Sequence, residues 1–356
     1  ALKSLYSMKT PHILIIRFSA MGDVAMMVPI VFSLAKQYPD VRISVVSRPF
    51  ARSFFQRIAP NVSFMAVDLK KDYKGIRGLS ALYRRLLAKR PTAIADFHNV
   101  LRTRYLRFRF LLGGYSVAHI NKHKHGKKLL CQRENKVFRQ QPTSFQNYAD
   151  VLAKLGYPIK PSFTSIFPEG GGDLKSLPDI IGEKLSTDCW IGIAPFAAHV
   201  GKMYPREKME KVINKITLSH PTWRIFLFGG GKDEVDVLNS WAEKYPQCVC
   251  VANVLHGLEE ELILMSHLDT MVSMDSANMH LASLVGTRVV SIWGATHPYC
   301  GFMGWNQQED DAVQITTLSC RPCSVFGNKP CYRGDFACMN NILPEEIVQR
   351  VEAGIS

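Results

Sequence analysis

Short apolar runs alternate with stretches of helical periodicity along most of the chain. In the helical stretches, apolar residues recur every three or four positions. Because one parallel strand can follow another only through a long connection, usually a helix, this alternation predicts parallel sheets covered on both faces. In the first half the runs are HILIIRF, VRISVVS, VSFMAVD and TAIADF, and helices are expected near 24–37, 50–58, 75–89 and 101–114.

A stretch rich in Pro and Gly, from 158 to 187, interrupts this rhythm and indicates a domain boundary. We therefore expect an N-terminal domain over 8–165, a linker over 166–187 and a C-terminal domain over 188–356. Ligands of such sheets bind at the carboxyl ends of the strands. The second half restarts with WIGIAPF, WRIFLFGGG, CVCVA, DTMVSMD and RVVSIWG, with helices expected near 205–218, 233–244, 258–266 and 277–285.

The composition is that of a globular protein, with 47% hydrophobic and 21% charged residues among 356. The apolar run over 26–35 is too short to span a bilayer, and the opening ALKSLYSMKT lacks the apolar core of a signal peptide. We therefore expect a cytoplasmic protein that starts naturally at Met8.

Charge is divided unequally along the chain. Residues 1–165 hold 29 Lys and Arg against 7 Asp and Glu, a net charge of +22, whereas residues 166–356 hold 15 against 23, a net charge of −8. The basic half suits an acidic partner such as nucleic acid, an anionic membrane face or a phosphorylated glycolipid. High solubility is the alternative explanation.

The basic residues concentrate in LRTRYLRFRFLLGG and NKHKHGKKLL. The first stretch predicts an amphipathic helix whose apolar face is buried and whose Arg-rich face is exposed. We expect the second, with His119, His123 and His125, to form a basic loop. The apolar positions at helical spacing in the first stretch are Leu101, Tyr105, Phe108 and Leu112.

A lone carboxylate, Asp23, stands between the first strand and the first helix in RFSAMGDVAMMV. Asp at a helix start accepts hydrogen bonds from free backbone N–H groups and suits the helix dipole. At the carboxyl end of a strand it is also placed to take part in chemistry. Both interpretations stay open on the residues alone.

Three further stretches follow strands of the second half. In SMDSANMHLA, a helix start near Ala277 offers N–H groups to an anion, while Asp275 suits sugar hydroxyls and His280 lies one turn along. FGGGKDE matches no phosphate-binding fingerprint, but Glu234 could reach a ligand from the helix start. In the third stretch, APFAAHVGKMYP, Lys202 follows a strand and could neutralise a phosphate. Capping residues, a structural histidine and a solvated lysine are the alternatives.

Four cysteines fall in CRPCSVFGNKPCYRGDFAC. A C-x2-C pair followed by two further thiols could bind a structural zinc ion, although the spacing of the second pair departs from that of a zinc ribbon. Disulfides formed on oxidation are the alternative. The four are Cys320, Cys323, Cys331 and Cys338.

Together these pieces resemble the bacterial heptosyltransferase family, glycosyltransferase family nine, which transfers heptose from an ADP-sugar onto the lipopolysaccharide inner core. RFSAMGDVAMMVP resembles the family's Arg-x-Ser-x-x-Gly-Asp-Val signature, MDSANMHLA its Asp-Ser/Thr-x-x-x-His element, and WGATHP its Gly-x-Thr-x-Pro turn. The resemblance extends over nearly the whole chain from Met8.

The resemblance implies an α/β fold of the GT-B class, with two Rossmann-like domains facing each other across a cleft. The first domain would bind mainly the acceptor and the second mainly the nucleotide sugar. Relatives often carry hydroxyl residues where this chain has Ala197 and Ala198, and a Gly at Ala277, so the sugar and base of the donor stay open. The implied roles are catalytic base for Asp23, phosphate contact for Lys202, ribose contact for Glu234, and donor contacts for Asp275, Ser276, Ala277 and His280.

We therefore expect an inverting glycosyltransferase that carries a sugar from a nucleotide-diphosphate donor, ADP-heptose first, to an anionic glycolipid. Arg102 and Arg104 would contact the acceptor at the cytoplasmic face of the inner membrane. Fixed protein charge would take the place of a divalent metal, so the only expected metal is the structural zinc. One alternative is a basic nucleic-acid-binding module, for which the sequence shows no readout element. The other is a GT-B enzyme that isomerises or hydrolyses a nucleotide sugar.

Overall fold

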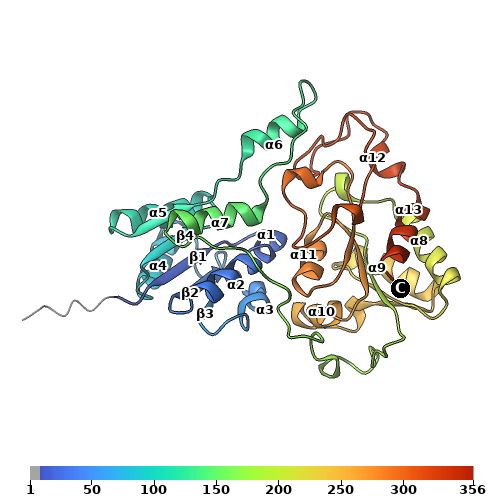
Figure 1. Cartoon of the computed structure of the whole chain (residues 1–356), viewed down its shortest axis with the longest axis horizontal. Coiled ribbons are helices and arrows are strands. Elements are labelled where there is room, and N and C mark those ends of the chain that lie inside the picture. The colour runs from blue at the N-terminus through green and yellow to red at the C-terminus, as the bar shows by residue number, and fades with distance from the viewer. Residues whose placement is uncertain (1–8, 356) are drawn as a thin grey trace, which may run out of the picture. The chain divides into compact units, whose positions relative to one another are not determined.

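The computed structural model describes residues 9–355, so that Met8, the expected start, lies outside the described residues. Two compact units divide the chain. Within the described residues, the first unit comprises 9–122 and 144–163, and the second comprises 123–143 and 164–355. Figure 1 traces the chain through both units from blue to red.

The first unit is built on a five-stranded parallel sheet in the order β3-β2-β1-β4-β5. The central strand β1 pairs with β2 on one side and with β4 on the other, so that Ile13 lies between Ile43 and Ala93. The strands are β1 (His12–Ile16), β2 (Arg42–Ser47), β3 (Val62–Ala66), β4 (Ala93–Asp96) and β5 (Ser116–His119).

Helices cover both faces of this sheet. Leu14 and Ile16 of β1 pack with residues of α4 and α5 in one apolar cluster. Ile13 and Ile15 alternate to the other face and are fully buried as well. The helices are α1 (Met21–Ala25), α2 (Val28–Gln37), α3 (Arg52–Phe55), α4 (Gly75–Leu87), α5 (Leu101–Leu112) and α7 (Ser144–Lys154), with a 3-10 turn η1 (Pro49–Ala51).

Helix α5 lies at the expected place, but the opposite side of it faces the core. Its buried residues are Thr103, Leu106 and Phe110. Leu101 and Leu112, which were expected to be buried, are 84% and 70% exposed. The prediction of the buried face was wrong because apolar residues occur on both sides of this helix, and periodicity cannot tell which side meets the sheet.

The second unit contains a six-stranded parallel sheet in the order β11-β10-β9-β6-β7-β8. Its central strands β6 and β9 are buried at every position, as expected where helices cover both faces. The strands are β6 (Trp190–Ala194), β7 (Arg224–Leu227), β8 (Cys248–Cys250), β9 (Thr270–Met274), β10 (Val289–Ile292) and β11 (Ala312–Val313).

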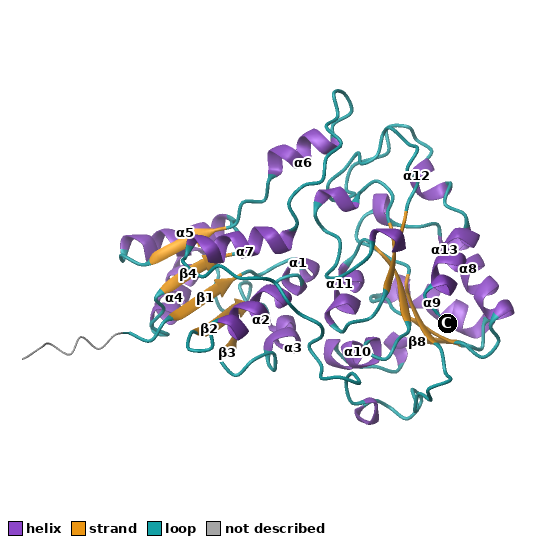
Figure 2. Cartoon of the chain, viewed as in Figure 1, coloured by secondary structure: helices purple, strands orange, loops and turns teal. Residues whose placement is uncertain are grey.

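Figure 2 shows α8, α9 and α13 on one side of this sheet and α10 and α11 on the other. Residues of the first group pack with the strands in one apolar cluster. The helices are α8 (Arg206–Ser219), α9 (Lys232–Lys244), α10 (Leu258–Met265), α11 (Ala277–Leu284), α12 (Ala337–Asn340) and α13 (Pro344–Ala353). The 3-10 turns are η2 (Leu174–Ser176), η3 (Val200–Lys202), η4 (Val251–Asn253), η5 (Pro298–Cys300) and η6 (Glu309–Asp311).

The segment 123–143 was expected in the N-terminal domain, but it packs with the second unit. It contains α6 (Lys124–Cys131), where a basic loop was expected. The Gln141 N–H donates to the Tyr299 carbonyl oxygen at 2.8 Å, and the Lys136 ammonium donates to the Cys320 carbonyl oxygen at 3.4 Å. The local sequence could not show this, because Lys136 and Cys320 are 184 residues apart in the chain.

The α/β class with two Rossmann-like units is confirmed. Among residues 9–355, helices with the length and apolar character needed to cross a bilayer are absent.

The reversed orientation of α5 makes a direct prediction about stability. Leu106→Ala should lower the free energy of unfolding by about 2–5 kcal/mol, because it leaves a cavity in a closely packed core. Leu112→Ala, on the same helix, should change it by no more than about 0.5 kcal/mol, because that side chain is largely exposed. Urea unfolding of the two variants tests this, and a larger loss for Leu112→Ala would reverse the assignment of the faces.

Candidate active site residues

In the first unit, the buried Arg17 forms an ion pair with Asp23. Arg17 directly follows β1, and its Nη2 lies 2.9 Å from Asp23 Oδ2. Its Nη1 donates to the Phe97 carbonyl oxygen at 2.8 Å, beyond the end of β4. The guanidinium therefore ties together the carboxyl ends of two adjacent strands and fixes Asp23 there.

Asp23 also caps the first helix. Its Oδ2 accepts the Ala20 N–H at 3.4 Å, and the Tyr148 hydroxyl donates to its backbone carbonyl oxygen at 2.7 Å. Both side-chain contacts use Oδ2, and within residues 9–355 the structure gives Oδ1 no hydrogen bond. Because the side chain is 30% exposed, capping leaves one carboxylate oxygen available to a ligand.

A neutral histidine lies beside this pair. Burial, followed by the nearby Arg17 cation, lowers the pKa of His98 to about 3. Its Nδ1 accepts the Phe18 N–H at 3.4 Å, so the ring proton belongs on Nε2, which lies 3.5 Å from Ser19 Oγ. His98 is thus an uncharged neighbour of Arg17 and Asp23 at neutral pH.

A buried carboxylate that was not predicted from the sequence, Asp96, holds the loop after β4. Asp96 Oδ1 accepts the N–H groups of His98 at 2.9 Å and of Asn99 at 2.8 Å. Its Oδ2 pairs with Arg107 at 2.8 Å. The signal was available in DFHN, a run of polar residues at the carboxyl end of a buried strand.

The four arginines of α5 differ in their surroundings. Arg107 is bonded to Asp96, and Arg109 lies 4.4 Å above the Tyr83 ring, so both serve the fold of this unit. Arg102 and Arg104 are exposed, and Arg104 donates to Asn99 Oδ1 at 3.1 Å. Of the four, these two are therefore the arginines with exposed side chains.

The second unit brings two of the predicted donor residues into contact. Lys202 Nζ lies 3.2 Å from Asp275 Oδ2, and the same oxygen accepts the Thr296 hydroxyl at 2.9 Å. Asp275 is 3% exposed. These residues follow β6, β9 and β10, which are adjacent strands, so one edge of the sheet carries them all.

The cysteine-rich segment, residues 320–338, packs against this cluster. Gly327 has a φ of +72°, and a Cβ there would lie 2.7 Å from Lys202 Cγ. Only glycine fits both the left-handed backbone and the space beside the lysine stem. Arg321 donates to the carbonyl oxygens of Thr296 at 3.0 Å and Gly294 at 2.6 Å, which fixes the loop after β10.

The remaining predicted donor residues lie in the loops and helix starts that follow β7 and β9 of the same sheet. Glu234, in the first turn of α9, accepts the Gly230 N–H on Oε2 at 2.9 Å. Ser276 precedes α11, and its hydroxyl lies 3.3 Å from that of Ser273. Ala277 begins the helix, and His280 is buried one turn along.

The four cysteines of the proposed zinc site line one narrow pocket. Cys338 is buried in the core beside Met339, and the other three are half-buried. Across 9–355, however, no three His, Cys, Asp or Glu side chains are placed so that they could hold a metal ion together. The thiols gather as expected, but their arrangement does not fit a preformed metal site.

Comparison with known proteins agrees with the motifs. The family model for glycosyltransferase family 9 (heptosyltransferase) matches residues 74–329. Lipooligosaccharide heptosyltransferase 2 of Campylobacter jejuni is 24% identical over 166 residues, which are 46% of this chain and 50% of that protein. The match thus spans about half the length of this relative.

Solved structures share the fold along nearly the whole chain. The family 9 glycosyltransferase of Veillonella parvula superposes with a TM-score of 0.72 at 17% identity, covering 98% of both chains. E. coli heptosyltransferase WaaC with ADP-2-deoxy-2-fluoro heptose superposes with a TM-score of 0.64 at 16% identity, covering 96% of this chain and 99% of that one. Since the family match covers most of the sequence, the resemblance seen in the motifs is confirmed, and the chain belongs to glycosyltransferase family 9, the heptosyltransferases.

Proposed function

We propose that this protein transfers heptose from ADP-heptose to a hydroxyl group of a lipopolysaccharide-type glycolipid, with inversion at the anomeric carbon. Family membership supports the reaction class, and the WaaC structure with an ADP-heptose analogue supports the donor. The observation that carries the proposal is the Lys202–Asp275 pair at the carboxyl ends of adjacent strands. Ligands of parallel α/β sheets bind at this edge.

Each donor residue would have a role that suits its surroundings. Lys202 would turn from Asp275 toward the diphosphate, whose charge exceeds that of one carboxylate. The free N–H groups at the start of α11 would bind the same anion. Asp275 would keep its bond to Thr296 and accept a sugar hydroxyl, and Glu234 would contact the ribose.

In this account Asp23 acts as the general base. Oδ1 would take the proton from the acceptor hydroxyl as that oxygen attacks the anomeric carbon, and ADP would leave from the opposite face. Arg17 would hold the carboxylate through Oδ2 during this step. Lys202 would stabilise the negative charge that develops on the leaving phosphate, so the mechanism needs no divalent metal.

The rival reactions differ in their products. An enzyme that hydrolyses the donor would release free heptose, and one that isomerises it would return an altered ADP-sugar. A product analysis with and without glycolipid separates both from transfer. The basic nucleic-acid-binding alternative has no support in the family match.

Helix α5 would contact the membrane that carries the acceptor. Its outward stripe, Leu101, Phe108 and Leu112, is exposed and lies between Arg102 and Arg104 on the helix surface. An apolar stripe flanked by basic residues is typical of helices that lie at the surface of an anionic bilayer. We therefore propose peripheral binding at the cytoplasmic face of the inner membrane.

The cysteine cluster has a structural role in this proposal. Cys338 packs in the core of the second unit, and Gly327 in the same segment supports Lys202. A zinc ion held by the four thiols stays a prediction.

Asp23→Asn separates capping from catalysis. Asn keeps a side-chain oxygen that can accept from the Ala20 N–H and from Arg17, but it removes the charge that pairs with the buried Arg17, so some loss of stability is expected while the ADP-heptose affinity of the folded protein should stay close to that of the parent. Asn cannot take up the acceptor proton, so the transfer rate should fall roughly 10²- to 10⁴-fold. Transfer assays beside donor titrations measure both effects, and a transfer rate near that of the parent would return Asp23 to a capping role alone.

Lys202→Ala tests the donor site. Loss of a charge-assisted hydrogen bond to phosphate should weaken ADP binding by about 10- to 100-fold, while adenosine binding should change little. Leaving Asp275 unpaired could also destabilise the protein, but such a loss would lower the affinities for ADP and adenosine alike. The ratio of these two affinities therefore reports the contact with phosphate. Lys215→Ala, which removes a lysine of α8 that pairs with Glu345 of α13, is the matched control. Equal losses for ADP and adenosine would place the phosphates elsewhere.

The double substitution Arg102→Gln and Arg104→Gln tests the membrane face. At about 1 kcal/mol per basic residue near an anionic surface, binding to phosphatidylglycerol vesicles should weaken roughly 30-fold, and less at high salt. Arg77→Gln with Arg84→Gln, two exposed positions on α4, removes the same charge from the same unit and should have a clearly smaller effect. If the two pairs weaken vesicle binding equally, the attraction is general and α5 is not the contact surface.

A further inference from the structure

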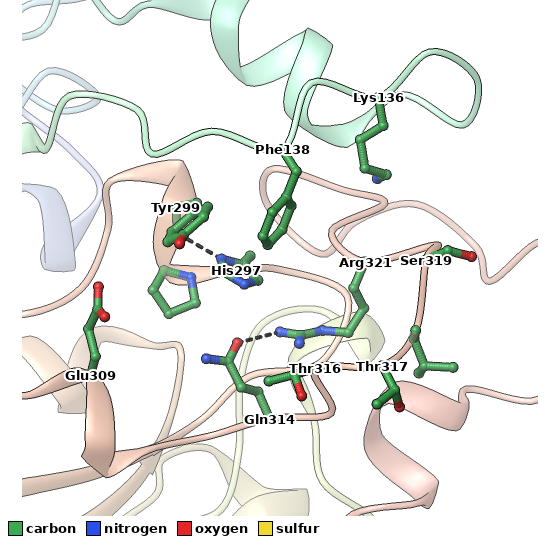
Figure 3. Close-up of a pocket in the computed structure, with 12 residues that line it drawn as sticks. Lys136, Phe138, His297, Tyr299, Glu309, Gln314, Thr316, Thr317, Ser319 and Arg321 are labelled. Atoms are coloured by element: carbon green, nitrogen blue, oxygen red, sulfur yellow. Dashed lines mark hydrogen bonds between the residues drawn. The ribbon is translucent and has the colours of Figure 1, made fainter.

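The second unit contains a pocket that the proposed reaction does not use (Figure 3). Its volume is about 450 Å³, within the range of small-molecule sites, roughly 300–1,000 Å³. It lies between residues 136–138, after α6, and the loops 297–299 and 314–321, which all belong to this unit. It lies on the β10–β11 side of the sheet, away from the loops after β6 and β7 that carry Lys202 and Glu234.

Three aromatic rings form one wall of this pocket. The Phe138 ring centre lies 5.1 Å from that of His297 and 4.8 Å from that of Tyr299. His297 and Tyr299 are 4.6 Å apart, and Figure 3 shows the three rings grouped together. Phe138 is 55% exposed, so a flat apolar surface is presented to any occupant.

The two cations that line the pocket are already bonded to the protein. Lys136 Nζ donates to the carbonyl oxygens of Leu130 at 3.2 Å and Cys320 at 3.4 Å, and also to that of Pro322. Arg321 donates to three backbone carbonyl oxygens and to Gln314 Oε1, the last at 2.9 Å. Through these hydrogen bonds both side chains hold together the loops that form the pocket.

The third basic group is uncharged. Burial, and then the Arg321 and Lys136 cations, lower the pKa of His297 to about 4, and its Nδ1 accepts the Tyr299 N–H at 2.9 Å. An acidic side chain, Glu309, also lines the pocket and is exposed. A phosphate would therefore find most of the N–H donors of these two cations already used by protein acceptors, and it would lie near the Glu309 carboxylate.

The remaining wall offers uncharged hydrogen-bonding groups. Gln314 Oε1 accepts a hydrogen bond from Arg321, and this bond does not use the amide N–H groups of Gln314, which can act as donors. Exposed hydroxyls of Thr316, Thr317 and Ser319 line the same side, and Figure 3 shows them across the pocket from the aromatic rings. Hydroxyl, amide and carboxylate groups opposite an aromatic face suit a ligand with several hydroxyls and an apolar C–H face.

We propose that this pocket binds a neutral pyranose ring, stacked on Phe138 and hydrogen-bonded to the Thr316–Ser319 side. It would be a saccharide subsite separate from the donor site, and it does not depend on the identity of the donor. The two sites share a hydrogen-bonded connection, since Arg321 donates to the Thr296 backbone and the Thr296 side chain donates to Asp275.

The test uses the full chain and simple sugars. Saturation-transfer NMR with methyl glucopyranoside, methyl galactopyranoside and N-acetylglucosamine should show millimolar binding of at least one of them. Phe138→Ala should weaken that binding by about fivefold or more through loss of the stacking surface. Phe326→Ala removes a phenylalanine that is also 55% exposed in the same unit but does not line the pocket, and should leave sugar binding unchanged.

Saturating ADP should not displace the sugar, because the proposed donor residues Lys202, Glu234 and Asp275 do not line this pocket. Binding that Phe138→Ala leaves intact, displacement by ADP, or absence of pyranoside binding would each overturn the proposal. Inorganic phosphate that competes with the sugar would also overturn it, because it would show a free cation in the pocket. Failure of heptose transfer alone would refute the proposed function and leave this result standing.

Discussion

The ion pair between Lys202 and the buried Asp275 is the interaction on which the second unit's candidate site depends. A carboxylate with 3% exposure is costly to bury unless it is paired and hydrogen-bonded, and Lys202 and Thr296 meet that need together. Three loops after adjacent strands are thereby held at one edge of the sheet. The cysteine-rich segment completes the arrangement, because Gly327 leaves space for the lysine stem and Arg321 fixes the Thr296 backbone.

The first unit uses the same physical device at the corresponding edge of its own sheet. Arg17 ties Asp23 to the end of β4, while Tyr148 and the Ala20 N–H hold the start of α1. In both units an ion pair positions a carboxylate at the carboxyl ends of parallel strands. The difference lies in exposure: Asp23 keeps one oxygen open, as a proton acceptor requires, and Asp275 is enclosed, as a fixed hydrogen-bond acceptor requires.

The sequence predicted the architecture well and the long-range contacts poorly. Alternating strands and helices are local patterns, so both parallel sheets and the place of α5 follow from them. The buried side of α5 does not, because Leu106 and Leu112 are equally apolar and only the sheet distinguishes them. Nor could local sequence place α6 in the second unit. Motif order placed Asp23, Lys202 and Asp275 at strand ends, but the partners Arg17 and Thr296 became apparent only in three dimensions.

The decisive measurement is a crystal structure of the protein with bound ADP. We expect a phosphate oxygen roughly 2.7–3.2 Å from Lys202 Nζ, with Asp275 still bonded to the Thr296 hydroxyl. The phosphates should lie at the N-terminus of α11, beside Ser276 and Ala277. ADP bound elsewhere, with the Lys202–Asp275 pair undisturbed at 3.2 Å, would show that this ion pair does not mark the donor site.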